Sequence, residues 1–492
     1  MRNRVLFINP PLSSTVKVKF ASHQIPLGFL YMAGLLEKNS FVVKILDCPL
    51  YFRQKREISK DSVRIGIFPE QIEKEIREFK PDVIGVSCSF SMFESDSFEV
   101  INLIKKINRK IIVAAGGAHA SSNPQFVLRN KNIDLIIMGE GELTMLEIAE
   151  RVRANKRLDN IKGTAVMSKN KFIKNPPREP IKNLDELDPA WHLIDFKKYF
   201  EHPDNYSITM RSPSINIITS RGCPGNCAFC SVKTVWGRSW RAMSAKKVVN
   251  QIEYLYKKQG VNHFRINDDN LTLDKKRIIE ICNEIIKRKL NIKWDTPSGL
   301  AMWTLDEQVL DKMKKSGYYR ITFGIESGCK KTLKYISKNI DLNKANQLID
   351  YCHKIGLWVA SFFVIGFPYE TKADINQTVQ YIINSKINFP FVFIAQPYPG
   401  TRMFDDFAKE NLIPEGILES STPILTKYNS KYLKADELIK IRNKIYKQFY
   451  IKKLLSYSNP VVFYREFLSK IRSFEDLKYT FKIINNLFTS FL

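Results

Sequence analysis

Three cysteines in one short loop are the feature that most restricts how this chain can fold. Cys223, Cys227 and Cys230 stand at C-x3-C-x2-C spacing in a loop with glycine and proline, directly after a strand-like run at 215–218. Thiolates so close along the chain can converge on one metal centre, and cysteine thiolates are the usual ligands of an iron–sulfur cube. Three ligands leave one iron open to an exchangeable group. A zinc site needs a fourth Cys or His nearby, and residues 203–262 contain no histidine, so a zinc knuckle and three unrelated core thiols are the weaker alternatives.

Length and composition predict a globular protein of two or three domains. It has 492 residues, of which 44% are hydrophobic, enough for a large core. The other five cysteines are scattered, which is typical of small buried side chains rather than of a disulfide framework. The residues before the strand-like 5–8 are too few for a signal peptide, and no apolar stretch approaches the ~20 residues that span a bilayer. We therefore expect a cytoplasmic protein.

Residues 1–155 predict a doubly wound parallel sheet, a Rossmann-like α/β domain, because short continuous apolar strands alternate with helical patterns. The expected strands are 5–8, 42–46, 83–87, 111–114 and 135–138. Ligands bind such sheets beyond the carboxyl ends of the strands. The candidate binding residues at those ends are Asn9, Pro10, Ser87, Gly116, Gly117, His119, Gly139 and Glu140. Residues 156–210, with a proline-rich stretch at 174–180, are expected to be a linker and lead-in.

Strand and helix patterns alternate six more times across residues 211–430. The expected strands are 215–220, 263–267, 293–297, 319–324, 359–365 and 392–396. Polar residues and glycines follow several of these strands, notably Asp268, Asp269, Glu326, Ser327 and Gly366. Taken singly, each has an ordinary structural explanation, such as a helix N-cap or a turn. Four such groups at strand ends, in order behind the cysteine loop, indicate a ligand site.

The cysteine loop, with Phe229 before the last cysteine, resembles the signature of radical S-adenosylmethionine (SAM) enzymes. The resemblance implies a partial (β/α)6 barrel of TIM type. It implies a [4Fe-4S] cluster on the three cysteines, with SAM chelated by the open iron. The residues that would contact SAM are Phe229, Asp268, Asp269, Glu326, Ser327 and Gly366.

The N-terminal region resembles the cobalamin-binding domain that precedes the barrel in one large subfamily, the class B radical SAM methyltransferase-like proteins. The matching features are the opening N-P-P, the G-G-x-H turn and the G-E-G-E after the last strand. The string D-x-H-x-x-G, which supplies a histidine ligand to cobalt elsewhere, does not occur, so we expect no ligand from that motif. A domain that serves only as a packing module is the alternative. For His119 alone, a satisfied turn histidine and a cofactor contact remain equal alternatives.

The resemblance implies a cobalamin-dependent radical SAM enzyme. SAM is cleaved to a 5′-deoxyadenosyl radical, hydrogen is abstracted from an unactivated carbon, and methylcobalamin methylates the substrate. Alternatives are a radical cyclase or rearrangement enzyme of the same architecture and, in another class, a cobalamin or Fe–S sensor. A tRNA methylthiotransferase would carry an extra N-terminal cysteine triplet, but residues 1–222 hold only Cys48 and Cys88. Nucleic acid is therefore not expected as a partner, and we expect a small-molecule or lipid substrate and a flavodoxin, ferredoxin or reductase as electron donor.

The last segment, residues 431–492, is a basic helical region. The whole chain has 77 Lys and Arg against 50 Asp and Glu, a net charge of +27, and this segment has 13 against five. Such an excess suits nucleic acid, acidic substrates or an anionic membrane, or is a solvated surface. Apolar residues recur here at helical spacing beside lysines: Leu438, Ile441, Ile445 and Phe449 with Lys440, Lys444 and Lys447. This face either caps the barrel or lies peripherally on an anionic membrane.

Overall fold

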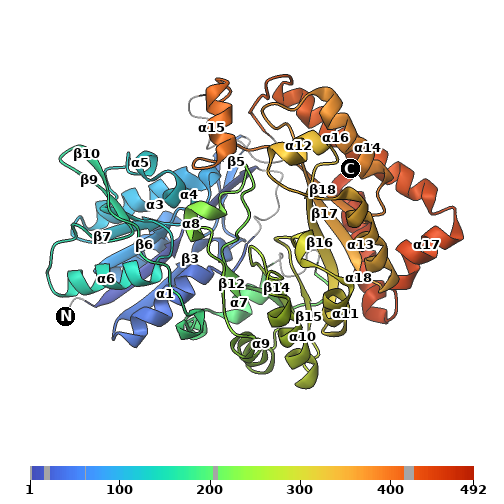
Figure 1. The fold of residues 1–492 in the computed structure, drawn as a ribbon. Helices are drawn as coiled ribbons and strands as arrows, with labels where there is room; N and C mark the ends of the chain where they lie inside the picture. Colours follow the sequence, from blue (N-terminus) through green and yellow to red (C-terminus); the bar gives the residue numbers. More distant parts are fainter. Residues whose placement is uncertain (1–2, 16–22, 61, 203–208, 415–425, 492) are drawn as a thin grey trace. The chain divides into compact units, whose positions relative to one another are not determined.

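The computed structural model describes most of the chain, in two compact units (Figure 1). The described residues are 3–15, 23–60, 62–202, 209–414 and 426–491, the last of these without side chains beyond 483. We call the first the N-terminal unit, which comprises Met1–Asp204 and Ser231–Gly237, and the second the barrel unit, which comprises Asn205–Cys230 and Arg238–Leu492.

The N-terminal unit is built on a sheet of seven strands in the order β10-β9-β8-β7-β6-β1-β3. Five strands are parallel and confirm the expected doubly wound domain: β1 (Arg4–Asn9), β3 (Val42–Asp47), β6 (Val83–Ser87), β7 (Ile112–Gly116) and β8 (Leu135–Ile137). An antiparallel hairpin of β9 (Thr164–Ser168) and β10 (Lys171–Lys174) extends the β8 edge. Since β1 pairs with β3 on one side and β6 on the other, the strand order reverses between β1 and β6, the switch point at which such sheets bind ligands.

Both faces of this sheet are covered, which explains the continuous apolar strands. In β1, Leu6 and Ile8 face one core, together with α2 (Pro69–Phe79) and α3 (Glu94–Ile107). Val5 and Phe7 face the other core. The second core is completed by helices α1 (Leu27–Lys38) and α6 (Glu142–Arg153). Because successive side chains of a strand point to opposite faces, every position in β1 between its ends must be apolar.

A small antiparallel sheet in the same unit was not expected. It contains β2 (Leu12–Thr15), β4 (Lys55–Ser59) and β5 (Ser62–Ile65). All five residues of β4 are exposed, so the strand carries no alternation of buried and exposed positions that the sequence could reveal.

The barrel unit contains six parallel strands that are hydrogen-bonded in chain order, which confirms the expected partial barrel. They are β11 (Ser214–Ile217), β14 (His263–Ile266), β15 (Lys293–Asp295), β16 (Tyr318–Glu326), β17 (Trp358–Ile365) and β18 (Phe389–Ile394). Parallel strands bring all their carboxyl ends to one rim, where barrel active sites lie.

The longer helices between these strands begin at side-chain caps. A Ser, Asp or Thr accepts a hydrogen bond from a backbone N–H in the first turn, which satisfies one of the unpaired donors of a helix start. These caps are Ser244 for α9 (Ala245–Gln259), Asp274 for α10 (Lys275–Lys287), Asp306 for α11 (Glu307–Lys315), Asp341 for α13 (Leu342–Lys354) and Thr371 for α14 (Lys372–Asn384).

The chain ends in helices α16 (Ala435–Ser456), α17 (Pro460–Glu466) and α18 (Phe474–Phe491). Leu438, Ile445 and Phe449 of α16 are buried, and Arg442 donates a hydrogen bond to the carbonyl of Val392 in β18 (2.8 Å). This face therefore caps the barrel, as the first of the two alternatives predicted. No helix within the described ranges is both long and apolar enough to cross a membrane.

Candidate functional site

The three cysteines lie half-buried in a loop that follows β12 (Ser220–Arg221). The loop is fixed at Ala228, whose N–H donates to the Ile336 carbonyl and whose carbonyl accepts from Met403 N–H, both at 3.0 Å. Two of the thiols flank Gly225: a methyl group there would lie 3.3 Å from Cys223 Sγ and 4.0 Å from Cys227 Sγ. The described residues include no preformed group of three His, Cys, Asp or Glu that could hold a metal ion.

A largely buried ion pair interacts electrostatically with these thiols. Lys338 Nζ donates to Glu326 Oε1 at 2.6 Å, and Glu326 is the last residue of β16, with a positive φ of 69°. Burial lowers the pKa of Lys338, but Glu326 and the thiols of Cys227 and Cys230 outweigh it, so the net shift is upward. Burial raises the pKa of the Cys227 thiol, and the Lys338 ammonium opposes that shift. Glu326 adds to the effect of burial, so the net shift of the Cys227 pKa is upward and Lys338 offsets only part of it.

Gly324 makes room for this pair. A side chain there would begin 2.7 Å from Lys338 Nζ and 2.9 Å from Glu326 Oε1. Ser327, the next predicted SAM contact, is fully buried. Its hydroxyl pairs with Thr378 Oγ1 (2.8 Å) and accepts from Cys329 N–H (3.1 Å), so the structure gives Ser327 a positioning role.

The residues after β14 hold the start of the cysteine loop. Asp268 is buried and accepts three hydrogen bonds of 2.6 Å, two from Thr219 and one from Ser220. Asp269 accepts from Gly222 N–H (3.0 Å), and burial raises the pKa of Asp269 to about 6. The two carboxylates predicted to contact SAM thus bind this chain's own loop.

Asn270 is a site residue that the sequence did not single out. Its side-chain amide Nδ2 lies 3.8 Å from Cys223 Sγ, within hydrogen-bonding range of sulfur. Trp240 Nε1 donates to the Asn270 carbonyl (2.9 Å), which fixes the backbone. The residue is 1% exposed, and its side-chain oxygen has no hydrogen-bond partner among the described residues. Its place directly after Asp268 and Asp269 is the signal that could have revealed it.

The end of β17 carries a buried acid. Glu370 accepts hydrogen bonds from Gly366 N–H (2.7 Å) and Phe367 N–H (3.3 Å) through Oε2, and from Thr332 Oγ1 (3.1 Å) through Oε1. Burial raises the pKa of Glu370 to about 7. Phe229 of the cysteine loop packs beside Phe367, with ring centroids 6.1 Å apart, so the loop and the end of β17 are one packed structure.

In the N-terminal unit, a polar cluster lies at the carboxyl ends of β1 and β3, beside the switch point. Asn9 Nδ2 donates to Asp47 Oδ1 (2.8 Å), and Asp47 Oδ2 contacts His23 Nε2 (2.8 Å) and the hydroxyl of Tyr199. Burial, then the charge of Asp47, raises the pKa of Tyr199 far above its ordinary value. Asn9 was predicted; His23, Asp47 and Tyr199 come from three separate segments and have no common sequence signal. Pro10 is buried next to the cluster.

The other predicted residues of this unit lie at the carboxyl ends of β6 and β7 and in the helix that follows β7. Ser87 and Gly116 end β6 and β7, and Gly117 precedes α4 (Ala118–Ser122), which contains His119. His119 is 3% exposed; its Nδ1 lies 2.9 Å from Ser91 Oγ and its Nε2 lies 2.5 Å from Glu94 Oε2. Both ring nitrogens are engaged, so this histidine has the role of a satisfied buried residue and offers no nitrogen to a metal.

A cavity of about 440 Å³ opens beyond β8. Gly139 and Glu140 line it, as does Ser121, which accepts a hydrogen bond from Gly139 N–H (3.0 Å). Residues 233–237, which follow the cysteine loop in the chain and include most of α8 (Val232–Trp236), form another wall. The two last residues of the predicted cofactor set therefore lie at a concave site.

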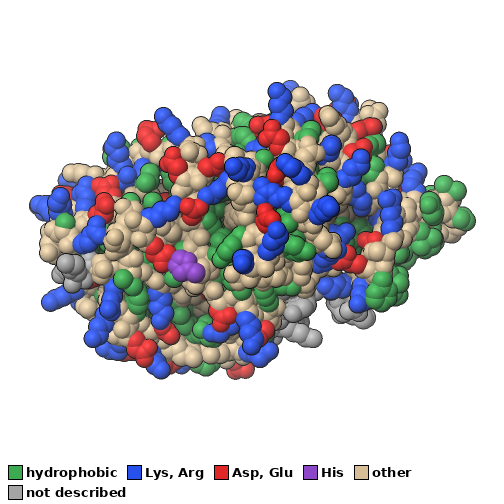
Figure 2. Space-filling model, turned by 90° about the horizontal axis from the view of Figure 1, so that it is seen from below, with side chains coloured by type: hydrophobic (Ala, Val, Ile, Leu, Met, Phe, Trp, Pro, Cys, Tyr) green, Lys and Arg blue, Asp and Glu red, His purple; other side chains and the backbone are tan. Residues whose placement is uncertain are grey.

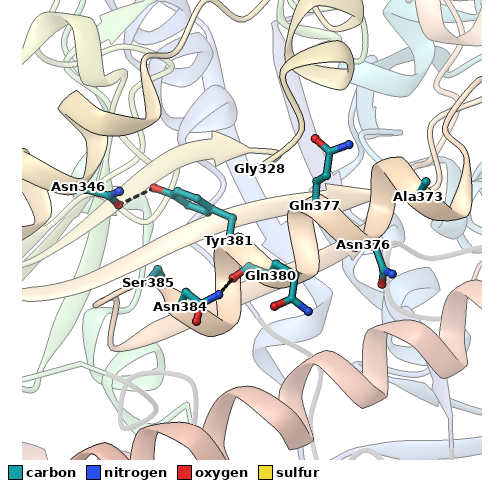
Figure 3. A pocket seen from close by; sticks show the side chains of 9 residues that line it. All are labelled: Gly328, Asn346, Ala373, Asn376, Gln377, Gln380, Tyr381, Asn384 and Ser385. Atoms are coloured by element: carbon teal, nitrogen blue, oxygen red, sulfur yellow. Dashed lines mark hydrogen bonds between the residues drawn. The ribbon is translucent and has the colours of Figure 1, made fainter.

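A second pocket lies among helices of the barrel unit and contains none of the predicted residues (Figure 3). Tyr381 of α14 donates a hydrogen bond to Asn346 Oδ1 of α13 (3.0 Å) across its floor. Its lining is largely amide side chains, without a titratable cluster or a cysteine. The candidate site is therefore the cysteine loop and the carboxyl ends of the strands.

Two family profiles match separate parts of the chain. The B12 binding domain matches residues 13–149, and the Radical SAM superfamily matches residues 217–382. These ranges fall on the doubly wound sheet and on the barrel.

Similarity to individual proteins extends over nearly the whole chain. An uncharacterized methyltransferase of Pyrococcus horikoshii, PH0819, is 30% identical over 91% of this chain and 93% of its own. The cytidylyl-2-hydroxyethylphosphonate methyltransferase of Streptomyces wedmorensis is 31% identical over 85% of this chain and 84% of its own. The anaerobic magnesium-protoporphyrin IX monomethyl ester cyclase of Rubrivivax gelatinosus is 26% identical, over 83% and 72%.

Among solved structures, the radical S-adenosylmethionine methyltransferase TsrM from Kitasatospora setae has the same fold. The TM-score is 0.66 at 18% identity, with 83% of this chain and 75% of TsrM covered. The TsrM structure contains cobalamin and a [4Fe-4S] cluster. Together, the profiles and the full-length relatives confirm the resemblance of the cysteine loop and of the N-terminal strand ends: the chain belongs to the radical SAM superfamily, among the members that carry an N-terminal B12-binding domain.

Proposed function

We propose that this protein is a cobalamin-dependent radical SAM enzyme that methylates an unactivated carbon atom of a small-molecule or lipid substrate. The observation that carries the proposal is the half-buried three-cysteine loop, held by the residues after β14, in a chain that also has a B12-binding domain. The two relatives of 30% and 31% identity, which align over more than four fifths of the chain, are both named methyltransferases.

In this proposal Cys223, Cys227 and Cys230 hold a [4Fe-4S] cluster. The fit rests on the donor set, since thiolates are the ligands such clusters require. Phe229, Glu326 and Gly366 are the residues proposed to contact SAM. Asp268, Asp269 and Ser327 are proposed to position the residues around SAM and not to contact SAM, because their hydrogen bonds go to the loop and to neighbouring helices.

Cobalamin is proposed to bind at the carboxyl edge of the first sheet. Asn9, Pro10 and Ser87 lie at the β1–β6 switch point, where the fold binds ligands. Gly116, Gly117, Gly139 and Glu140 continue the edge towards the cavity beyond β8. His119 contributes packing there and not a bond to cobalt, because both of its nitrogens are engaged.

When bound, the cluster and SAM supply a 5′-deoxyadenosyl radical for hydrogen abstraction, and the corrinoid supplies a methyl group. The chain's own task is to bind and orient these groups and to keep water from the radical. Electrons are expected from a flavodoxin, a ferredoxin or a reductase.

The test is anaerobic reconstitution with iron, sulfide and hydroxocobalamin, followed by removal of unbound ligand. We expect about four irons and one corrinoid per chain, and 5′-deoxyadenosine when SAM and a reductant are added. The Cys223→Ala/Cys227→Ala/Cys230→Ala variant should keep the corrinoid and lose the iron and the SAM cleavage. Full iron in this variant would refute the assignment of the cluster ligands, and iron without corrinoid would refute that of the N-terminal unit.

A radical cyclase of the same architecture is the second candidate, because the relative from Rubrivivax gelatinosus is named a cyclase. SAM with a deuterated methyl group separates the two once a substrate is found. A methyltransferase transfers the label to the product, whereas a cyclase forms 5′-deoxyadenosine and leaves the product unlabelled.

A further inference from the structure

The last three helices present a large apolar surface to solvent. We call it the C-terminal apolar face, and its residues are Ile451, Leu454, Leu455, Val461, Tyr464, Leu468, Phe474, Leu477 and Phe481. Leu454, Val461 and Phe474 are each 71% exposed. Figure 2 shows hydrophobic side chains gathered at the right-hand end of the molecule, where α17 lies in Figure 1. Extended exposed apolar patches mark sites of interaction with proteins or membranes.

The spacing of these residues shows that exposed apolar side chains lie on one side of a helix. On α18, Phe474, Leu477 and Phe481 lie at i, i+3 and i+7, which places them on one stripe. In α17, Val461 and Tyr464 lie at i and i+3, and Leu468 follows in a short 3-10 helix (Leu468–Lys470). Three consecutive segments thus each carry apolar side chains that are exposed among the described residues.

The opposite faces of the same helices are packed, so the stripes are not the sides that dock on the barrel. Tyr479 of α18 is buried against Tyr319 and Trp358, with ring centroids 5.2 and 6.1 Å apart. Phe467, after α17, packs edge-on against the same Trp358 at 5.9 Å. A helix that is apolar on both faces needs a non-polar neighbour on both faces.

The charge around this face is positive. Residues 451–482 contain seven Lys and Arg against three Asp and Glu, and five of the seven cations remain at least partly exposed, because Lys453 and Lys470 are buried. Two of the acids are already paired, Glu466 with Lys453 (2.6 Å) and Glu475 with Arg211. The third, Asp476, accepts from the backbone N–H of Arg472. Lysines at positions 452 and 478 are exposed beside the apolar residues.

We propose that the C-terminal apolar face docks on the surface of an anionic lipid membrane. Apolar side chains would enter the boundary between headgroups and acyl chains while the surrounding lysines meet anionic headgroups. A second copy of this chain is the weaker occupant, because it would bring the same positive surface against itself. The face is distinct from Leu438, Ile445 and Phe449 of α16, for which the sequence had allowed a membrane role and which are buried.

Flotation of the full-length protein with lipid vesicles tests this. We expect the protein to float with phosphatidylcholine vesicles that contain about one third phosphatidylglycerol and to remain at the bottom with phosphatidylcholine alone. The variant Leu454→Ser/Val461→Ser/Phe474→Ser, with one change in each helix, should bind the anionic vesicles at least about tenfold more weakly. Lys452→Gln/Lys478→Gln should also weaken binding by roughly tenfold.

The matched control is Ile58→Ser/Met167→Ser/Ile173→Ser, which removes three exposed apolar side chains from the N-terminal unit. It should float like the wild type, and thermal unfolding should show that every variant folds. Failure of the wild type to float with anionic vesicles, or equal flotation of the serine variant of the C-terminal apolar face, would overturn the proposal. If sedimentation finds a wild-type dimer that this variant lacks, and neither protein floats, a second copy covers the face. None of these readouts depends on the cluster, SAM or cobalamin.

Discussion

At the scale of single residues, the site depends on buried polar groups whose partners are the chain itself. Asp268 and Asp269 hold the start of the cysteine loop, Lys338 pairs with Glu326 beside two thiols, and Glu370 gathers two backbone amides. Such groups are costly to bury unless they are hydrogen-bonded. They therefore make the site rigid, and their protonation links the stability of the barrel unit to pH.

Glu370→Gln should change how stability depends on pH. Because the pKa of Glu370 is raised to about 7 in the folded protein, folding favours the neutral acid. The stabilisation is complete below the ordinary pKa of glutamic acid and is lost as the pH rises through about 7. Glutamine stays neutral and can still accept from Gly366 N–H and donate to Thr332. The variant should therefore gain stability relative to wild type by up to about 3 kcal/mol at pH 8.

Urea denaturation of both proteins at pH 5 and pH 8 measures this difference. The unfolding free energy of the variant minus that of the wild type should be about 2 kcal/mol larger at pH 8 than at pH 5. A constant difference at both values would mean that Glu370 does not titrate in this range in the folded protein.

Asn270→Ala should alter the electronic properties of a reconstituted cluster without releasing it. The Asn270 amide lies 3.8 Å from Cys223 Sγ, and hydrogen bonds to cluster sulfurs stabilise the more negative, reduced state. Under the proposed ligation, the variant should keep wild-type iron content and show a lower reduction potential. Spectroelectrochemistry and the electron paramagnetic resonance signal of the reduced cluster provide the readouts. An unchanged reduction potential would mean that Asn270 contributes only packing.

At the scale of elements, helix α16 is attached to the barrel through a position that only glycine suits. Gly366, at the end of β17, has a φ of 84°, and a side chain there would begin 2.8 Å from Leu438 Cδ1 of α16. Gly260, after α9, has a similar φ of 72° but nothing within 4 Å of the same point. Alanine substitutions at these two glycines can therefore separate the free-energy cost of a left-handed backbone from the cost of steric crowding.

We expect Gly260→Ala to cost about 1 kcal/mol, for the left-handed backbone alone. Gly366→Ala should cost about 1–3 kcal/mol more, because it overpacks the contact between β17 and α16. Adding Leu438→Ala to Gly366→Ala should recover part of that excess, and it should destabilise the wild type on its own. Denaturant unfolding gives all four free energies; equal costs at the two glycines would show that α16 can shift to make room.

The elements also show which features the sequence could predict. Strands buried on both faces, such as β1 and β17, are continuous apolar runs and were located to within a few residues. β4 was missed, because a fully exposed strand has no such pattern. The ends of strands were predicted as site positions, but not their partners: Asp268 was expected to contact SAM, and the structure shows it bonded to Thr219.

At the scale of the whole molecule, long-range contacts explain what remained hidden. Lys338 is separated from Glu326 by α12 (Lys330–Tyr335), and no spacing rule links the two residues. His23, Asp47 and Tyr199 likewise meet only because the chain returns to the same strand ends. Local patterns predict elements, whereas pairs of this kind require the tertiary fold.

The division into two units leads to a prediction about their separate stabilities. If cobalamin binds the N-terminal unit and the cluster binds the barrel unit, each ligand should stabilise its own unit, since ligand binding to a folded state shifts its unfolding. At a free corrinoid concentration of 100 times the dissociation constant, the gain is about 2.7 kcal/mol, or roughly 5–10 °C for a unit of this size.

Differential scanning calorimetry of the full chain should show two transitions, of which hydroxocobalamin raises one and iron chelation after reconstitution lowers the other. The variant Cys223→Ala/Cys227→Ala/Cys230→Ala is the matched control: it should keep the corrinoid shift and lose the response to chelation. A single transition that responds to both treatments would mean that the units unfold together. Two transitions with no corrinoid shift would assign the N-terminal unit a packing role, and the proposed methyl transfer would then lose its methyl carrier.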